Sequence, residues 1–332
     1  INMIICRTPF RISFFGGGTD MPIWTEMHDG HVISSTINKF GYIFFRETKD
    51  IKNYRYKIRY YLNEEAKSYK EIKHPVIKSC IKHYKLTDKS LHITYDGDLP
   101  SRSGLGSSSS FTAGLINIIN YFNKKKLSKK KLAEQTIHFE HNILKENVGY
   151  QDQIAATYGG LNYIHFKKKK FSINSLNKFS NTKRLLNESI MLFLVEGKRN
   201  ASSIELKKNK KILENYQIYK DIYEITIEAL NIIKSNKPKK ILDDFGNLLN
   251  EYWNLKKSID KSITSDEIDY YCKNFIKLGA SGCKLMGAGS SGFILILANP
   301  EIQKRIKNKF HKKNFIKVGL ENSGSKIIYS DL

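Results

Sequence analysis

The sequence has no apolar run that approaches the ~18 residues needed to cross a membrane as a helix. Its first residues, INMIICRTPFRISFF, also lack the basic segment, long apolar core and small-residue cleavage site of a secretory signal. Hydrophobic residues make up 40% and aromatic residues 12% of the 332 residues, as in folded globular proteins. The sequence therefore predicts a globular, cytoplasmic protein with no membrane partner.

Cysteine is scarce, and its few positions form no recognisable site. The four cysteines include no CxxC pair, and no cluster of histidines accompanies them at the spacing of a metal site. Both a disulfide framework and a zinc site are therefore disfavoured. We expect buried free thiols at Cys6, Cys80, Cys272 and Cys283.

Arginine is also scarce for a chain with a formal charge of +24, since only nine of its 56 basic residues are arginine. A basic protein gains affinity for nucleic acid by releasing counterions from the phosphates. Here the lysines are spread along the chain in short runs, without the interleaved aromatic residues that stack on bases. The pattern favours a solvated lysine surface over nucleic-acid binding, with a field that attracts an anionic small substrate.

No internal repeat or low-complexity linker divides the chain, although its length is that of two domains. The first third is rich in β-branched and aromatic residues, several with the alternation of strands. Residues 201–278 instead carry helical spacing of apolar residues. This distribution predicts an α+β fold with two domains, 1–180 and 181–332, and a boundary near 175–188.

The stretch PSRSGLGSSSSFTAGL, which begins at Pro100, lies between a strand pattern and an amphipathic helix. A strand, a glycine-rich turn and a helix N-terminus together form an anion site, and serine hydroxyls can ligate magnesium. A serine-capped helix after a tight turn has the same local pattern. The Walker motif is absent because no lysine follows Gly106, and the dinucleotide fingerprint is absent because Ser109 replaces its third glycine.

Glu140 interrupts the apolar stripe formed by Ala133, Ile137 and Leu144 on the next predicted helix. A carboxylate at such a position needs a cation or hydrogen bonds to offset the loss of water. Either a bound metal ion or a neighbouring lysine satisfies this requirement. The pattern therefore identifies Glu140 as a candidate ligand without deciding between the two.

Asp152 follows Gly149 at the start of a short predicted helix that ends at Gly159 and Gly160. An acid in the first turn of a helix is favoured by the helix dipole, either as a cap or as a nearby ionised group. An ionised carboxylate also suits a group that accepts a proton from a substrate hydroxyl. Both interpretations of Asp152 follow from the residues alone.

Three motifs in this order resemble those of the GHMP kinases, which include galactokinase, homoserine kinase and mevalonate kinase. PFRISFFGGGTD resembles the first motif, PSRSGLGSS the phosphate loop, and KLMGAGSSGFILIL the third motif. The resemblance implies a two-domain GHMP kinase fold, with a mixed or antiparallel N-terminal sheet carrying helices and a C-terminal ferredoxin-like α/β sandwich. It implies that the phosphates of ATP are bound by Pro100, Gly104, Leu105, Gly106, Ser107, Ser108 and Ser109.

The resemblance also implies the catalytic residues and the cofactors, ATP and Mg²⁺. Asp152 matches the catalytic aspartate of the family. Arg11 lies where the family carries a cation beside the transferred phosphoryl group. For Arg11, a surface ion pair on a strand is the alternative. Magnesium would be held by Glu140 and Ser108, with Ser107 or Ser109 in place of Ser108 if the register slips.

The first motif distinguishes substrates within the family. Galactokinases carry Glu-His before Thr-Asp, and this chain has two glycines there, so galactose loses two ligands. The motif looks most like the branch that phosphorylates D-glycero-D-manno-heptose 7-phosphate at its anomeric oxygen. We expect the glycines to make room for this seven-carbon sugar; Asp20 would bind hydroxyls or cap the helix MPIWTEMH. Substrate contacts are expected from Gly17, Gly18, Thr19, Asp20, Arg199, Lys284, Gly287 and Gly289.

The substrate phosphate needs a cation, for which Arg199 is the first candidate and Lys198, Lys284 and Arg102 are others. The expected function is synthesis of D-glycero-D-manno-heptose 1,7-bisphosphate for surface polysaccharide precursors. A fucose or other sugar 1-kinase and a non-catalytic sugar and nucleotide sensor are the alternatives. The sequence leaves open whether the chain forms a homodimer.

Overall fold

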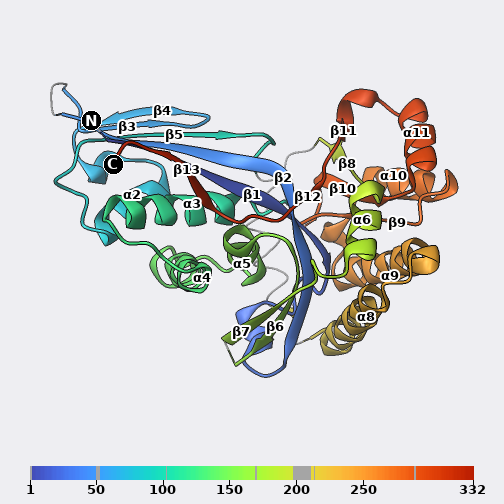
Figure 1. The fold of residues 1–332 in the computed structure, drawn as a ribbon. Helices are drawn as coiled ribbons and strands as arrows, with labels where there is room; N and C mark the ends of the chain where they lie inside the picture. The colour runs from blue at the N-terminus through green and yellow to red at the C-terminus, as the bar shows by residue number, and fades with distance from the viewer. Residues whose placement is uncertain are drawn as a thin grey trace.

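The structure is a computed structural model with two regions, each built on its own sheet (Figure 1). The larger region lies at the left of Figure 1 and contains both ends of the chain, and the smaller lies at the right. The described residues are 2–49, 53–101, 103–168, 170–196, 211, 212, 214–287 and 289–332.

Two long antiparallel strands, β1 (Met3–Phe15) and β2 (Gly30–Glu47), form the centre of the first sheet. The strand order is β13-β1-β2-β5-β3-β4, and every pair is antiparallel except β3 with β5. The hairpin of β6 and β7 extends the sheet along β2. The other strands are β3 (Tyr56–Arg59), β4 (Asn63–Ala66), β5 (Leu91–Gly97), β6 (Leu161–Lys167), β7 (Lys170–Ser175), β12 (Leu320–Glu321) and β13 (Lys326–Ser330).

Helices cover one face of this sheet (Figure 1). The central one, α3 (Ser107–Phe122), is the amphipathic helix that the sequence predicted, and it buries Phe111, Leu115 and Ile118. It packs against β1 and so brings the end of the glycine-rich stretch to this strand. The others on this face are α2 (Pro75–His83), α4 (Lys129–His138), a π-helical turn (Phe139–Ile143) and α5 (Gln151–Tyr158), with a 3₁₀ turn at Tyr69–Glu71. The short α1 (Pro22–Thr25) follows the first motif.

The second sheet has four antiparallel strands in the order β11-β8-β10-β9. Along the chain, a strand is followed by helices, two strands, a helix and a strand, which is the ferredoxin-like arrangement. The predicted fold class is therefore confirmed. The elements are α6 (Ser180–Ser189), β8 (Ile190–Val195), α8 (Tyr216–Ser235), α9 (Pro238–Ile259), α10 (Asp266–Lys277), β9 (Gly282–Leu285), β10 (Gly292–Leu297), α11 (Pro300–Lys309) and β11 (Phe315–Ile316), with 3₁₀ turns at Lys261–Ile263 and Lys312–Asn314.

The last strands of the chain return to the first sheet. β13 pairs with β1, with Ser330 opposite Ile4, and β12 pairs with β2. Residues 320–330 thus belong to the N-terminal sheet although they follow the second one in sequence. The division at residue 180 stays a prediction about folding units, and the sheets do not follow it at the end of the chain.

The C-terminal end of β1 joins the two regions. Phe14 and Phe15 pack edge-to-face on Phe245 of α9, with ring centroids 5.4 and 4.9 Å apart, and Phe15 also contacts Tyr252. Aromatic pairs of this geometry stabilise beyond the area they bury. The first motif therefore lies at the junction of the regions, where ligand sites are common.

Two predictions from composition can be compared with the structure. All four cysteines are buried free thiols, as the sequence predicted. None of the helices in the described part of the chain combines the length and the apolar character that a membrane span requires.

Candidate active site

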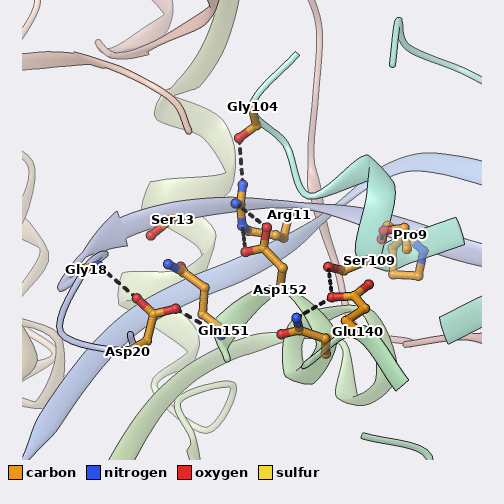
Figure 2. Close-up of polar contacts among 12 residues, drawn as sticks. Pro9, Arg11, Ser13, Gly18, Asp20, Gly104, Ser109, Glu140, Gln151 and Asp152 are labelled. Atoms are coloured by element: carbon orange, nitrogen blue, oxygen red, sulfur yellow. Dashed lines mark hydrogen bonds and ion pairs between the residues drawn. The ribbon is translucent and has the colours of Figure 1, made fainter. Parts of the chain in front are cut away.

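Arg11 of β1 and Asp152 in the first turn of α5 form a bidentate ion pair (Figure 2). Arg11 Nε lies 2.7 Å from Asp152 Oδ1, and Arg11 Nη2 lies 2.7 Å from Oδ2. The arginine side chain is 8% exposed and the aspartate 25% exposed. Since a carboxylate offers about four lone-pair sites, Asp152 is fixed by the arginine and still able to accept a hydrogen bond from a ligand.

The glycine-rich stretch lies directly against this ion pair. Arg11 Nη1 donates to the Gly104 carbonyl at 2.7 Å, and the Arg11 backbone N–H donates to the Leu105 carbonyl at 2.9 Å. Gly106 adopts a left-handed conformation, with φ of 72°. A Cβ there would lie 3.1 Å from Arg11 Cγ and 3.3 Å from Asp152 Oδ2, so a glycine permits the close approach.

The same stretch leads into the uncapped N-terminus of α3. Gly106 is the N-cap residue, and no side chain makes a capping hydrogen bond there. The first N–H groups of a helix and the positive end of its dipole attract anions. The stretch also accepts a hydrogen bond at the Ser103 carbonyl from Phe293 N–H of β10, at 3.3 Å. The structure therefore brings the first motif and the strand after the third motif to a potential phosphate site.

Glu140 is fully buried in the π-helical turn that follows α4. Its Oε2 accepts hydrogen bonds from Ser109 Oγ, at 2.9 Å, and from Gln153 Nε2 (Figure 2). Its Oε1 is buried and has no hydrogen-bond partner among the described residues. Burial raises the pKa of Glu140 to about 8, because the ionised carboxylate has lost its water.

The serine that contacts Glu140 is Ser109, whereas the sequence named Ser108 first. Ser108 is exposed on the first turn of α3, and Ser109 is buried on the side that faces Glu140. Ser109, one of the alternatives that the sequence left open, therefore contacts Glu140, and the assignment of Ser108 as a magnesium ligand stays a prediction. One residue along a helix rotates a side chain by about 100°, which separates the two serines.

The residues at Glu140 fit a magnesium ion. The unpartnered, buried Oε1 is an oxygen that a cation would satisfy, and the serine hydroxyls of α3 are further oxygen donors. Within the described ranges, no three His, Cys, Asp or Glu residues cluster as metal ligands. Magnesium is commonly held by one or two carboxylates together with substrate phosphates and water. A single carboxylate is thus sufficient for a metal that arrives with ATP.

Asp20 lies between the first motif and the start of α5. Its Oδ1 accepts a hydrogen bond from Gly18 N–H at 2.8 Å, and its Oδ2 accepts one from Gln151 N–H at 3.1 Å. It does not cap α1, because Met21 occupies that N-cap position without a side-chain bond. Burial raises the pKa of Asp20, and the two N–H groups oppose that rise. Asp20 therefore holds the turn of the first motif against the helix that carries Asp152.

The two glycines of the first motif do not leave open space beside them. A Cβ on Gly18 would lie 2.7 Å from Tyr219 Cε1 and 3.3 Å from Lys256 Nζ. A Cβ on Gly17 would lie 3.3 Å from the Tyr252 hydroxyl. The glycines therefore permit the close approach of side chains from α8 and α9. That they also make room for a seven-carbon sugar stays a prediction.

Sequence reasoning did not identify these side chains of α8 and α9. Tyr252 and Lys256 lie four residues apart on one helix, so they share a face. That spacing was the available signal, but nothing local indicates that this face meets a loop more than 230 residues earlier. Lys256 Nζ donates to the Gly17 carbonyl at 2.9 Å.

Among the other expected substrate ligands, Lys284 of β9 is the one whose ammonium reaches the first motif. Its Nζ donates to the carbonyls of Ser13 and Phe14, at 2.8 and 3.2 Å. The Thr19 hydroxyl instead donates to buried backbone carbonyls, and Gly289 packs on the backbone of Ile263. Gly287 lies in the turn after β9 with φ of 79°. Arg102, Lys198 and Arg199 lie outside the described residues.

Comparison with known proteins places this site in a family. Residues 72–160 match the model of the GHMP kinases N terminal domain, and residues 238–317 match that of the GHMP kinases C terminal. The D-glycero-alpha-D-manno-heptose 7-phosphate kinase of Campylobacter jejuni is 31% identical over 321 residues, which cover 90% of this chain and 91% of that protein. The chain belongs to the GHMP kinase family. It is therefore a phosphotransferase with an alcohol group as acceptor, and ATP is its phosphoryl donor.

Solved structures share the fold of this GHMP kinase. A D-glycero-D-manno-heptose 1-phosphate kinase from Bacteriodes thetaiotaomicron has a TM-score of 0.77 at 21% identity, covering 98% of this chain and 99% of that one. The galactokinase of Lactococcus lactis, solved with galactose, has a TM-score of 0.75 at 17% identity, covering 98% and 95%. At these identities the likeness establishes the fold alone.

The contact between Asp20 and Gly149 gives a first prediction. A Cβ on Gly149 would lie 2.0 Å from Asp20 Oδ2, so Gly149→Ala must displace the carboxylate that joins the first motif to α5. We expect a loss of about 1–3 kcal/mol in the free energy of unfolding, measured by denaturant titration. Gly97→Ala is the control, because its Cβ would meet a movable tyrosine hydroxyl at 3.2 Å. Equal stability of the two variants would contradict the assigned contact.

Proposed function

We propose that this GHMP kinase is a cytoplasmic sugar-phosphate kinase that acts on D-glycero-D-manno-heptose 7-phosphate. It transfers the γ-phosphoryl group of ATP, with Mg²⁺, to the anomeric oxygen and yields the 1,7-bisphosphate for surface polysaccharide precursors. The observation that carries the chemistry is the Arg11–Asp152 pair beneath the glycine loop. Similarity across 90% of the chain to the C. jejuni heptose 7-phosphate kinase supports the choice of substrate.

In this mechanism Asp152 orients the acceptor hydroxyl and takes its proton. The hydroxyl oxygen forms a bond to the γ-phosphorus while the bond to the bridging oxygen breaks and ADP leaves. Asp152 is positioned for the proton because Arg11 holds both carboxylate oxygens and leaves lone pairs on the exposed side. The Arg11 guanidinium also places a positive charge beside the transferred group, where negative charge develops.

The loop from Pro100 to Ser109 binds the phosphates of ATP in this proposal, through backbone N–H groups at the start of α3. Glu140 and Ser109 would hold the magnesium ion, and Ser108, exposed on the same turn, offers a second hydroxyl. When bound, the ion neutralises charge on the phosphates. Lys284, Gly287 and Gly289 remain proposed acceptor contacts, as does Arg199.

A fucose or other sugar 1-kinase is the second candidate. The bifunctional fucokinase/GDP-fucose pyrophosphorylase of Arabidopsis thaliana is 21% identical over 331 residues, which cover 92% of this chain and 31% of that protein. This similarity supports a relation to kinases of free sugars. The two candidates differ in whether the acceptor already carries a phosphate.

A coupled ADP-release assay over heptose 7-phosphate, fucose, galactose and mevalonate tests the proposal. We expect kcat/KM for heptose 7-phosphate to exceed the others by at least about 100-fold, equivalent to nearly 3 kcal/mol of transition-state binding. The phosphorus NMR spectrum of the product should show a new phosphate on the anomeric carbon. Faster turnover of fucose would favour the second candidate. Binding of ATP and sugar without turnover would indicate a sensor.

A further inference from the structure

Lys256 of α9 is a buried cation that the proposed chemistry does not use. It is 8% exposed, and its ammonium donates a hydrogen bond to the Gly17 carbonyl. Within the part of the chain that the structure describes, no carboxylate lies within ion-pair distance of it. One neutral carbonyl satisfies one of its three N–H groups. A buried ammonium with so little compensation is costly unless an anion joins it.

Two further polar side chains beside Gly17 have buried atoms without partners. Ser13 Oγ and Gln151 Oε1 make no hydrogen bond with any described residue, and the two residues are 7% and 9% exposed. A Cβ on Gly17 would lie 3.3 Å from Gln151 Nε2 and 3.6 Å from Ser13 Oγ, so both side chains converge there. In the view of Figure 2 they lie between the Gly18–Asp20 contact and the Arg11–Asp152 pair. Unpaired buried polar atoms are rare, and their convergence on one point indicates a bound polar ligand.

The position of Lys256 relative to Asp152 indicates which part of the ligand it meets. Arg11 and Ser13 are alternate residues of β1, which share a face and lie roughly 7 Å apart along a strand. Gly17 follows beyond the end of this strand at Phe15. Along the chain, Arg11 with its partner Asp152 therefore comes first and the unpaired hydroxyl of Ser13 second. Gly17, whose carbonyl contacts Lys256, comes last. A sugar with its reacting end at Asp152 extends its opposite end toward Lys256.

We propose that Lys256 binds the phosphate that the acceptor carries before the reaction, while Ser13 and Gln151 bind sugar hydroxyls between the two ends. This inference rests on the proposed function and deepens it by naming the residue that selects a phosphorylated acceptor. A lysine suits the role as a point charge that donates to a phosphate oxygen. Lys284, whose Nζ lies 4.4 Å from the centroid of the Tyr252 ring, adds positive charge to the same end.

The charges around Lys256 are consistent with this role. Asp20 is the charged neighbour that influences it, and its carboxylate already accepts two backbone N–H groups. Tyr219 and Tyr252 flank it from α8 and α9, and burial raises the pKa of both hydroxyls, so they stay neutral. Burial lowers the pKa of Lys256 to about 8, and a bound phosphate would favour its charged form.

Lys256→Met and Lys257→Met form a matched pair of variants that tests the inference. Lys257 is the next residue of α9 and makes a half-exposed ion pair with Asp269, so its loss should change little. For Lys256→Met we expect KM for heptose 7-phosphate to rise about 10- to 100-fold, as for loss of a charged hydrogen bond. KM for ATP and kcat/KM for the same heptose without its phosphate should stay within about twofold. The preference for the phosphorylated acceptor should therefore fall, and Lys256→Arg should retain most of it.

An equal loss of kcat/KM for both acceptors in Lys256→Met would overturn the inference, because it would show that Lys256 only supports the Gly17 turn. If Lys256→Met does not fold, Lys256→Gln keeps a donor for the Gly17 carbonyl without the charge, and the same preference is measured. A wild-type enzyme that turns over only the free sugar would overturn the proposed function as well. If the wild-type enzyme prefers heptose 7-phosphate over the free sugar and the Lys256 variants show the same preference, this inference alone is overturned.

Discussion

Asp152→Asn is expected to lower kcat by about 10²- to 10⁴-fold, the range for loss of a positioned general base. The amide cannot take the proton of the attacking hydroxyl. It also offers a single acceptor to Arg11, which donates to both carboxylate oxygens through Nε and Nη2. The loss should therefore appear in kcat, measured by ADP release at saturating substrates, with the thermal unfolding temperature changed by only a few degrees.

Asp29→Asn is the matched control, because Asp29 is a partly exposed carboxylate paired with His165 at 3.0 Å. Its activity should equal that of the wild type. Near-normal turnover of Asp152→Asn would refute the catalytic assignment. A double variant that combines Asp152→Asn with Arg11→Met tests whether the two residues act as one unit. If they do, the double variant loses little more kcat than either single variant.

Glu140→Gln is expected to raise the Mg²⁺ concentration required for half-maximal activity by at least about 10-fold, a tenfold change in affinity being about 1.4 kcal/mol. Glutamine keeps the shape of the side chain and an acceptor for Ser109, but it removes the charge that a cation needs. The fold should be at least as stable as the wild type, because burial disfavours the ionised carboxylate at this position.

Ligand-induced stabilisation gives a second readout that does not depend on turnover. The rise in unfolding temperature produced by ATP with Mg²⁺ over ATP alone should shrink in Glu140→Gln, since stabilisation follows affinity. Glu134→Gln on α4 is the control, because Glu134 pairs with the exposed lysines Lys130 and Lys131. An unchanged Mg²⁺ dependence of the activity in Glu140→Gln would refute the assignment of Glu140 as a metal ligand.

Parts of the site that depend on local interactions could be predicted from the sequence. The glycine loop before α3 and the acid in the first turn of α5 lie in the elements where they were predicted. Glu140, predicted on the helix after α3, lies in the π-helical turn at the end of α4. Each is set by short-range physics: glycine backbone freedom, helix periodicity and the need of a carboxylate for partners. These features can be recognised without knowing what packs against them.

Which of these groups meet depends on the tertiary structure. It selected Ser109 over Ser108 beside Glu140, and it returned β13 to the side of β1. It placed Tyr219, Tyr252 and Lys256 beside Gly17 and Gly18. Apart from Ser109 and Glu140, the residues in these contacts are more than 200 positions apart, where periodicity fixes the face of each helix but not its partner. Packing of α8 and α9 onto the end of β1 determines that partner, and with it the residues proposed to meet the acceptor.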